Sequence, residues 1–110
     1  MKQITLLLMC VLSVNLLADA TKGKAVFAAN CAICHTTNGG NALGPDMNMV
    51  SYTRKKQDIF NYAKDPYKYY KEFGYKANAM PTLPLEEQEL KDVADYIDSI
   101  QPFKKWMKKK

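Results

Sequence analysis

The clearest pattern of apolar and polar positions lies near the C-terminus, in the stretch PLEEQELKDVADYIDSI at residues 84–100. Its apolar residues recur three or four positions apart, at Leu90, Val93, Ile97 and Ile100. That spacing predicts one apolar stripe along an α-helix. Pro84 suits the first helical position and Pro102 marks the end, although no Ser, Thr or Asp stands where a side-chain cap is expected.

Weaker signals predict three further helices, at 21–30, at 57–64 and from Pro66 to near Gly74. In the first of these, Gly23 and Phe27 stand four residues apart and therefore share one face. Residues 36–49 are rich in Asn and Gly, which predicts a loop. Because no stretch alternates convincingly with period two, the expected fold class is all-α, with long loops.

The N-terminal segment 1–20 has the three parts of a secretory signal peptide. A positive charge near the start is followed by an uncharged, mainly apolar stretch of 14 residues at 4–17 and by the small-residue pattern Ala-Asp-Ala at 18–20. A spanning helix needs about 20 apolar residues, which argues against an uncleaved membrane anchor. We therefore expect export to the periplasm, cleavage near Ala20 and a mature domain of residues 21–110.

Removal of that leader leaves two cysteines, both in the motif CAICH at residues 31–35. The motif could be a redox dithiol, part of a zinc site or a covalent attachment point for haem. A thioredoxin-like dithiol follows a strand and opens a helix, whereas CAICH follows a predicted helix and leads into a loop. A structural zinc site needs four ligands, usually Cys or His, and the chain has one histidine. Haem attachment is the interpretation that remains.

Each position of CAICH has a role in haem attachment. The spacing Cys-x-x-Cys-His is the signature of c-type haem. Cys31 and Cys34 would form thioethers with the two vinyl groups of one porphyrin. His35 would then be carried beneath the macrocycle, where its imidazole can bind the iron as the proximal ligand. Assembly outside the cytoplasm agrees with the leader, so we expect one covalent haem c per chain.

The sequence resembles the class I c-type cytochromes, and specifically the short single-haem bacterial electron carriers, over roughly residues 22–101. GKAVFAANCAICH is similar to the family's first helix and attachment motif, and ELKDVADYIDSI is similar to its last helix. The resemblance implies three to five helices wrapped around one covalently bound haem. It also implies that the carbonyl of Pro45 accepts a hydrogen bond from the proximal imidazole, and that Tyr96 packs against Gly23 and Phe27.

The second axial ligand of the iron is expected to be a methionine. A second histidine ligand from the chain is impossible, because His35 is its only histidine. Met80 lies in the segment AMPTL, which resembles the family's methionine-ligand loop, and the proline that follows restrains the backbone. Met47 and Met49 are the alternatives, although they follow the proximal segment closely, and Met107 lies in the basic tail. Cys31, Cys34, His35 and Met80 are therefore the expected haem-binding residues, with His35 and Met80 on the metal.

Apolar side chains are expected to surround the haem, and the candidates are Phe27, Leu43, Val50, Ile59, Phe60, Leu90, Val93 and Ile97. Five of the seven tyrosines fall between Tyr62 and Tyr75, where packing is their expected role. A hydrogen bond from Tyr67 or Tyr70 near the Met80 sulfur is an additional hypothesis.

These expectations predict a function. His/Met ligation raises the reduction potential and leaves the iron without a vacant position for substrate. We therefore expect a soluble periplasmic electron carrier, not an enzyme, that moves single electrons between a respiratory donor complex and a terminal oxidase or reductase. If Met80 were not on the iron, the alternative would be a five-coordinate haem protein that binds small gases or acts on peroxide. A third interpretation is a structural cytochrome subunit of a larger complex.

The charge of the chain adds to this picture. It has 16 Lys and Arg against 11 Asp and Glu, a net charge of +5. Basic residues cluster at 54–76 and in the C-terminal tail, 102–110, and we expect them to be solvated. Such a charge can steer a small carrier to acidic docking surfaces. We expect a monomer with no nucleic-acid partner, and at most weak peripheral contact of the tail with a membrane.

Overall fold

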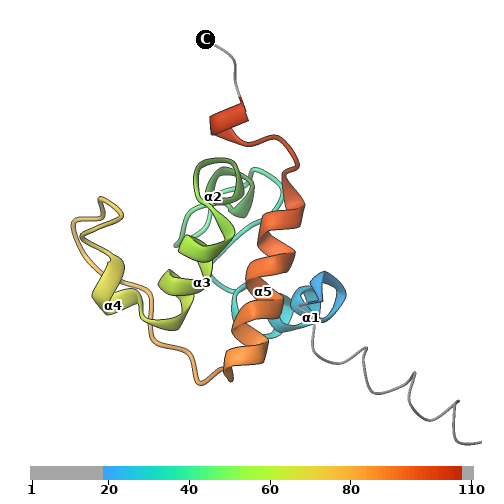
Figure 1. Cartoon of the computed structure of the whole chain (residues 1–110). Helices are drawn as coiled ribbons and strands as arrows, with labels where there is room; N and C mark the ends of the chain where they lie inside the picture. Colours follow the sequence, from blue (N-terminus) through green and yellow to red (C-terminus); the bar gives the residue numbers. More distant parts are fainter. Residues whose placement is uncertain (1–18, 108–110) are drawn as a thin grey trace, which may run out of the picture.

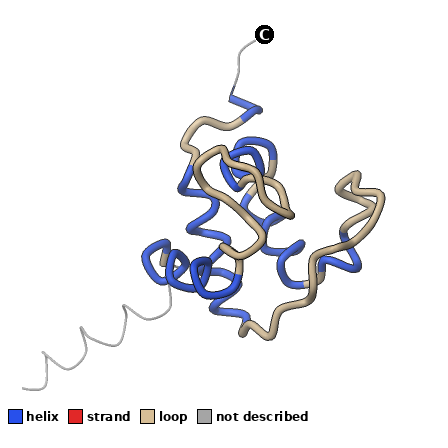
Figure 2. Tube along the Cα trace, turned by 180° about the vertical axis from the view of Figure 1, so that it is seen from behind, coloured by secondary structure: helices blue, strands red, loops and turns tan. Residues whose placement is uncertain are grey.

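The computed structural model describes residues 19–107, and every regular element among them is helical (Figure 1). The elements are α1 (Ala20–Asn30), α2 (Met47–Thr53), α3 (Lys56–Lys64), α4 (Pro66–Tyr69), α5 (Glu87–Ile100) and a 3₁₀ turn, η1 (Lys105–Met107). The all-α fold class is therefore confirmed. Seen from behind, the loop at 31–46 lies in front of the helices, and the chain from 70 to 86 runs along the side that carries α4 (Figure 2).

The predicted helices at 21–30 and 57–64 are confirmed to within one residue by α1 and α3. The last helix begins at Glu87 and not at Pro84. Glu86 precedes it with an extended backbone and donates its N–H to the Glu89 carboxylate at 3.0 Å, which is the half of a capping box that the N3 side chain supplies.

Two other expectations about local structure were wrong. Part of the predicted loop 36–49 belongs to α2, which Asp46 caps by accepting a hydrogen bond from the backbone N–H of Asn48 at 2.9 Å. The helix that opens at Pro66 ends at Tyr69, and the chain continues in turns to Gly74, whose φ of +89° is the left-handed conformation that glycine adopts readily.

The close crossing of α1 and α5 depends on Gly23. A Cβ atom at this position would overlap the carbonyl oxygen of Asp92 and lie 2.8 Å from the Cβ of Tyr96. One turn further along α1, the ring of Phe27 packs on that of Tyr96 with 5.6 Å between centroids. The packing of Tyr96 against Gly23 and Phe27 that the resemblance implied is thus confirmed.

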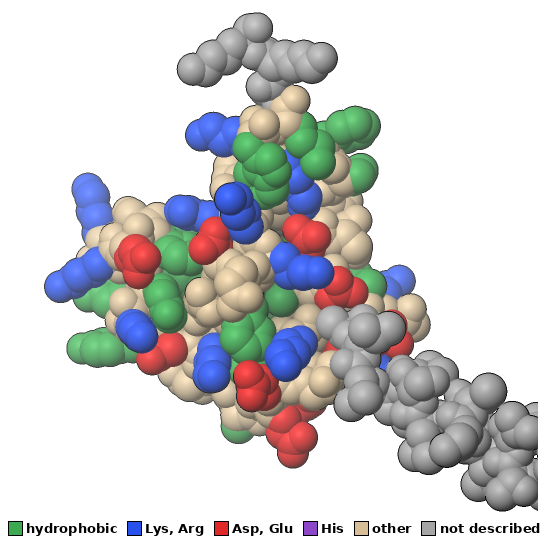
Figure 3. Space-filling view, viewed as in Figure 1, with side chains coloured by type: hydrophobic (Ala, Val, Ile, Leu, Met, Phe, Trp, Pro, Cys, Tyr) green, Lys and Arg blue, Asp and Glu red, His purple; other side chains and the backbone are tan. Residues whose placement is uncertain are grey.

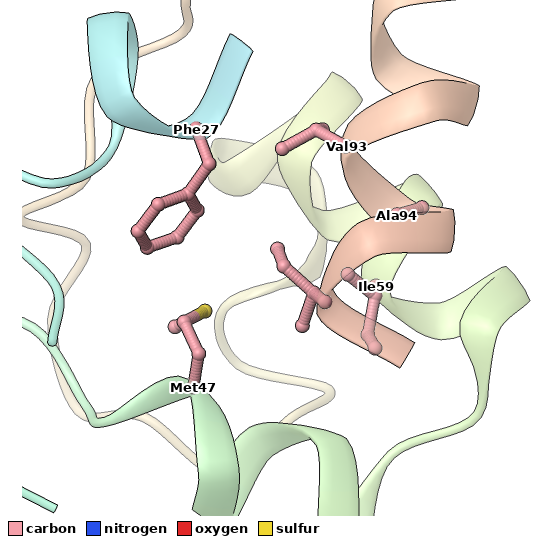
Figure 4. Close-up of a cluster of buried hydrophobic side chains, with 6 residues drawn as sticks. Phe27, Met47, Ile59, Val93 and Ala94 are labelled. Carbon is pink, nitrogen blue, oxygen red and sulfur yellow. The ribbon is translucent and has the colours of Figure 1, made fainter. Parts of the chain in front are cut away.

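The core is built around α5. Its buried members come from four helices and are Phe27, Met47, Ile59, Val93, Ala94 and Ile97. Figure 4 shows the ring of Phe27 from α1 and the thioether of Met47 from α2 extending toward one another. Val93 and Ala94 of α5 lie on the far side of that space, beside Ile59 of α3.

Lys104 corrects the expectation that the lysines of the C-terminal tail are solvated. It is only 7% exposed, and its Nζ donates to the Oγ of Ser51 at 2.7 Å and to the carbonyl oxygens of Ser51 and Asp98 at 2.9 and 2.8 Å. An ion pair with the Asp98 carboxylate at 3.1 Å completes its partners. The buried ammonium therefore joins the start of the tail to α2 and to the end of α5.

The leader expected at residues 1–20 falls mainly outside the described residues. Its last two positions, Asp19 and Ala20, belong to the start of α1, where Asp19 is the N-cap.

Gly23→Ala is expected to lower the free energy of unfolding by about 2–4 kcal/mol, because the methyl group has no room against the Asp92 carbonyl. Urea unfolding of the holoprotein measures this. Lys24→Ala, an exposed change in the same helix, serves as control and should stay within about 0.5 kcal/mol of the unmodified protein. Equal effects of the two changes would show that the crossing tolerates a side chain.

Lys104→Met is expected to cost about 1–3 kcal/mol of folding free energy, because it removes the donor to the Ser51 hydroxyl and carbonyl and leaves the Asp98 carbonyl with the Ser51 hydroxyl alone. Lys105→Met removes the same charge from an exposed neighbour and should have little effect. If thermal unfolding does not distinguish the two variants, the tail is not held as described.

Candidate cofactor site

A single cavity of about 370 Å³ brings the four predicted site residues together. Cys31, Cys34, His35 and Met80 all line it, together with side chains from α1, α2, α3 and α5. Most of the other lining residues are apolar, and Arg54 is the one Lys or Arg among them. A large apolar cavity with a few convergent polar groups is typical of a cofactor site.

Six of the eight apolar side chains expected around the haem line this cavity. Of the eight candidates, Phe60 and Leu90 do not reach the cavity: Phe60 borders a hollow between α3 and α5, and Leu90 is buried elsewhere. Sequence reasoning did not name several other lining residues, among them Arg54, Phe73, Leu83 and Leu85. Tyr62 and Tyr75, two of the tyrosines expected to pack, also line the cavity. The hollow between α3 and α5 offers no Cys, His or Met, which excludes it as the expected site.

The tyrosines nearest the cavity are not the two of the hypothesis. Tyr62 and Tyr75 line it, with their rings 5.8 Å apart, whereas Tyr67 and Tyr70 do not. Tyr67 is 74% exposed. Burial and the neighbouring Tyr75 raise the pKa of the Tyr62 hydroxyl, so this group stays protonated and neutral at physiological pH.

The CAICH segment forms a tight turn at the end of α1. The backbone N–H groups of Cys34 and His35 both donate to the carbonyl of Cys31, at 3.1 and 3.0 Å. The two thiols are not joined in a disulfide. Burial, and secondarily the neighbouring Cys34, raise the pKa of the Cys31 thiol to about 11, so it is protonated at neutral pH. A redox dithiol needs a lowered thiol pKa, so this environment disfavours that interpretation.

His35 is held by the segment that follows it. Its Nδ1 lies 2.9 Å from the carbonyl oxygen of Pro45, the contact that the resemblance implied. Since a carbonyl only accepts, Nδ1 is the donor and the lone pair is left on Nε2. Gly44 permits this contact, because a Cβ there would lie 2.6 Å from Nδ1 of the ring. The imidazole is therefore fixed in the tautomer that can bind a metal through Nε2.

Asp46 fixes the loop that carries Pro45. Its Oδ1 accepts hydrogen bonds from the Thr36 hydroxyl at 2.7 Å and the Gly39 backbone N–H at 3.0 Å, while Oδ2 accepts from Asn48. Partial burial raises the pKa of Asp46, but these hydrogen bonds outweigh it and hold the pKa below its ordinary value. The ionised carboxylate thus joins the two ends of the loop around His35.

The four methionines of the described chain differ in their access to the cavity. Met80 lines it, and its backbone N–H donates to the side chain of Asn78 at 3.2 Å in a turn just before Pro81. Met47 also lines the cavity, but its backbone N–H is bound to the carbonyl of Thr36, the residue after His35, at 2.8 Å. Met49 and Met107 are exposed. Met47 and Met80 therefore remain as candidates for the second axial ligand, and the backbone of Met47 is bound to the residue that follows His35.

Arg54 closes one part of the cavity wall. Its Nη2 donates to the carbonyl of Phe73 at 2.8 Å, and its guanidinium lies 4.4 Å from the centre of the Phe73 ring. The contact joins the residues after α2 to the turns that follow α4. It also places a positive charge at the cavity, suited to an anionic group of a cofactor.

The structure of residues 19–107 can also be compared with two other interpretations, a zinc site and a membrane-spanning helix. In this range no group of three or more His, Cys, Asp and Glu side chains is arranged to hold a metal ion, which leaves the zinc interpretation without a ligand set. None of the helices in the same range has the length and apolar character needed to cross a bilayer.

Comparisons with known proteins agree with the site. The sequence model of the Cytochrome c family matches residues 20–101. Cytochrome c6 of Pyropia tenera is 35% identical over 95 residues, which cover 81% of this chain and 100% of that protein. Cytochrome c6 of Synechococcus sp. is 35% identical over 94 residues, covering 81% of this chain and 76% of that protein.

A third relative, a cytochrome c-553-like protein of Synechocystis sp., is 28% identical over 82 residues, which cover 74% of this chain and 70% of that protein. No solved structure is significantly similar to the chain. The family match over most of the chain, the CAICH turn and the apolar cavity lead to one conclusion: the chain belongs to the cytochrome c family, whose cofactor is covalently bound haem c.

Proposed function

We propose that this protein is a soluble electron carrier in which Cys31 and Cys34 hold the haem covalently, His35 is the proximal ligand and Met80 the distal ligand. The observation that supports it best is the convergence of all four side chains on one apolar cavity. Two of the relatives described above are named cytochrome c6, which agrees with the proposal.

The chain's own residues prepare the site for this cofactor. Bound haem c supplies a one-electron ferric/ferrous couple. The turn at the end of α1 holds the two thiols in one segment, and the Pro45 carbonyl keeps the lone pair of His35 on Nε2. The loop that contains Met80 supplies the thioether available as the distal ligand, because the backbone of Met47 is hydrogen-bonded to Thr36, next to His35. Arg54 is suited to a propionate carboxylate.

The lining favours a carrier over an enzyme. Apart from His35 and the two thiols, its ionisable side chains are Arg54, Tyr62 and Tyr75. No carboxylate and no second imidazole faces the cavity from the described residues, so the side chains that most often act as general acid or base are not available there for peroxide chemistry. With Met80 on the iron, no coordination position is open to a gas or a substrate. Apolar walls also keep water away and support a raised reduction potential.

One edge of the cavity reaches the surface, as electron transfer requires. Leu43 lines the cavity and is 91% exposed, and Ile33 inside CAICH is 86% exposed. Lysines and arginines are spread over the face seen in Figure 3, interspersed with acidic side chains. The exposed apolar side chains of Leu43 and Ile33 suit brief docking of a redox partner, for which we propose a respiratory donor and acceptor. The net charge of +5 would steer the chain toward acidic docking surfaces.

Export to the periplasm through the N-terminal leader belongs to the same proposal and agrees with the assembly of c-type haem outside the cytoplasm. Weak peripheral contact with anionic lipid has one supporting feature. Phe103, Trp106 and Met107 are exposed close to the basic end of the chain, where apolar side chains gather in Figure 3. We treat this contact as secondary to protein docking.

Met80→Ala is expected to open the sixth position of the iron. The ferric spectrum should lose the weak far-red methionine-to-iron band, and the ferrous protein should take up carbon monoxide readily. Met47→Leu keeps an apolar side chain at the other lining methionine and should retain the band. Loss of the band in Met47→Leu with its retention in Met80→Ala would reverse the ligand assignment, and a high-spin unmodified protein would favour gas binding or peroxide chemistry.

Asp46→Asn is expected to lower the stability of the protein by an amount that depends on pH, because the Asp46 carboxylate holds the loop that follows His35. Because the folded-state pKa of Asp46 is lowered, its stabilising effect is fully present above the ordinary Asp pKa of about 3.9 and is lost as pH falls through the folded value. The variant should therefore be less stable than the unmodified protein at pH 7, and the difference should shrink below about pH 4. Denaturant unfolding followed at the Soret band measures both.

The control for this prediction is Glu72→Gln, which removes an exposed carboxylate far from the loop in sequence. It should show no such change in the stability difference. A difference for Asp46→Asn that stays constant from pH 7 to pH 3 would mean that the carboxylate charge does not hold the loop.

A further inference from the structure

The start of α1 is held by an aspartate on each of two helices. The backbone N–H of Asp19 donates to Oδ1 of Asp92 at 2.9 Å, where α1 and α5 cross. Asp92 is only 5% exposed, and the side-chain amide of Gln88 donates to the same oxygen at 3.1 Å. Nearby, the carbonyl of Asp92 faces Gly23 at the closest point of the crossing.

Asp92 lacks the positive partner that a buried carboxylate needs. The ion pairs formed within residues 19–107 join Lys56 to Asp95 and Lys104 to Asp98, and neither includes Asp92. Its two described donors are neutral N–H groups. A buried charge is costly unless it is paired as well as hydrogen-bonded. One of those donors, the nitrogen of Asp19, would become a cation if the chain began there.

Asp19 also completes the first turn of α1. Its side chain accepts from the backbone N–H groups of Thr21 at 2.8 Å and Lys22 at 3.4 Å, and its carbonyl accepts from Gly23 at 2.8 Å. A chain that began at Thr21 would lose all three bonds, and Asp92 would lose a donor. At either start an α-ammonium stands at the helix N-terminus, where the helix dipole disfavours positive charge, but only that of Asp19 faces the Asp92 carboxylate.

We propose that the exported protein begins at Asp19 and that its α-ammonium forms a buried ion pair with the carboxylate of Asp92. This inference rests on the export that we propose, and it places the cleaved bond between Ala18 and Asp19, two residues before the Ala20 site that the Ala-Asp-Ala pattern suggests. A leader peptidase would hydrolyse that bond with water, which leaves a carboxylate on Ala18 and an ammonium on Asp19.

The sequence permits cleavage at either bond. A small residue precedes both: Ala18 in one case and Ala20 in the other. The Ala20 site also has a small residue two positions further back, whereas Leu16 holds that place for the Ala18 site. The sequence pattern alone therefore favours Ala20. The contacts of Asp19 with Asp92 and with the first turn of α1 are what favour Ala18.

The first test is the N-terminus of the exported holoprotein. The full chain is produced with its own leader in a host that attaches c-type haem, and the periplasmic product is analysed by intact mass and N-terminal sequencing. A chain that begins at Asp19 supports the inference, and one that begins at Thr21 or elsewhere overturns it. Retention of Met1 in the periplasmic product would show that the leader is not cleaved, and would also overturn the inference. The absorption spectrum reports covalent haem independently, so its absence would refute the proposed function and not the cleavage site.

The second test measures the ion pair by a double-mutant cycle. Asp92→Asn keeps an acceptor but removes the charge, and a two-residue extension before Asp19 moves the ammonium away. Each change alone should lower the urea midpoint, and the two together should lower it by less than the sum. Asp95→Asn, on the same helix but paired with Lys56, is the matched control. Its effect on the urea midpoint should be additive with that of the extension. Additive effects for Asp92→Asn would overturn the ion pair, whatever the N-terminus.

Discussion

The backbone contact between α1 and α5 at Gly23 is the constraint on which the rest of the site depends. It brings α1 so close to α5 that no side chain fits between the Gly23 and Asp92 backbones. The end of α1 is thereby fixed relative to Val93 and Ile97, which line the cavity from α5. CAICH follows the last turn of α1 directly, so the crossing also decides where the thiols and His35 lie.

The chemistry of the site could be predicted from sequence because it is local. Cys31, Cys34 and His35 lie within five consecutive residues. The contact of His35 with Pro45 was expected from a short segment that resembles the same segment in class I cytochromes. The features that escaped prediction depend on distant partners. In the sequence, Lys104 is one of several lysines in a basic tail. Its burial depends on Ser51 of α2 and the end of α5, and no residue next to it along the chain indicates those contacts.

The tyrosines illustrate the same limit at shorter range. The helix that opens at Pro66 ends at Tyr69, earlier than its pattern indicated, so the turns that follow change the direction of every later side chain. Tyr75, which follows these turns, reaches the cavity, whereas Tyr67, inside the helix, is exposed to solvent. The seven-residue helix α2 was missed because its capping residue, Asp46, stands immediately after a Gly-Pro loop signal.

Both ends of the described chain are attached to α5, Asp19 through Asp92 and Lys104 through Asp98. Neither end can fray far without breaking a bond to this helix, and α5 also supplies much of the core. The N-terminal helix, α2 and α5 should therefore open as one cooperative unit, in which amide hydrogen exchange is slow and nearly uniform. The loops that line the cavity outside this unit, among them the segment from 70 to 86 that carries Met80, are then expected to open more readily and to admit water.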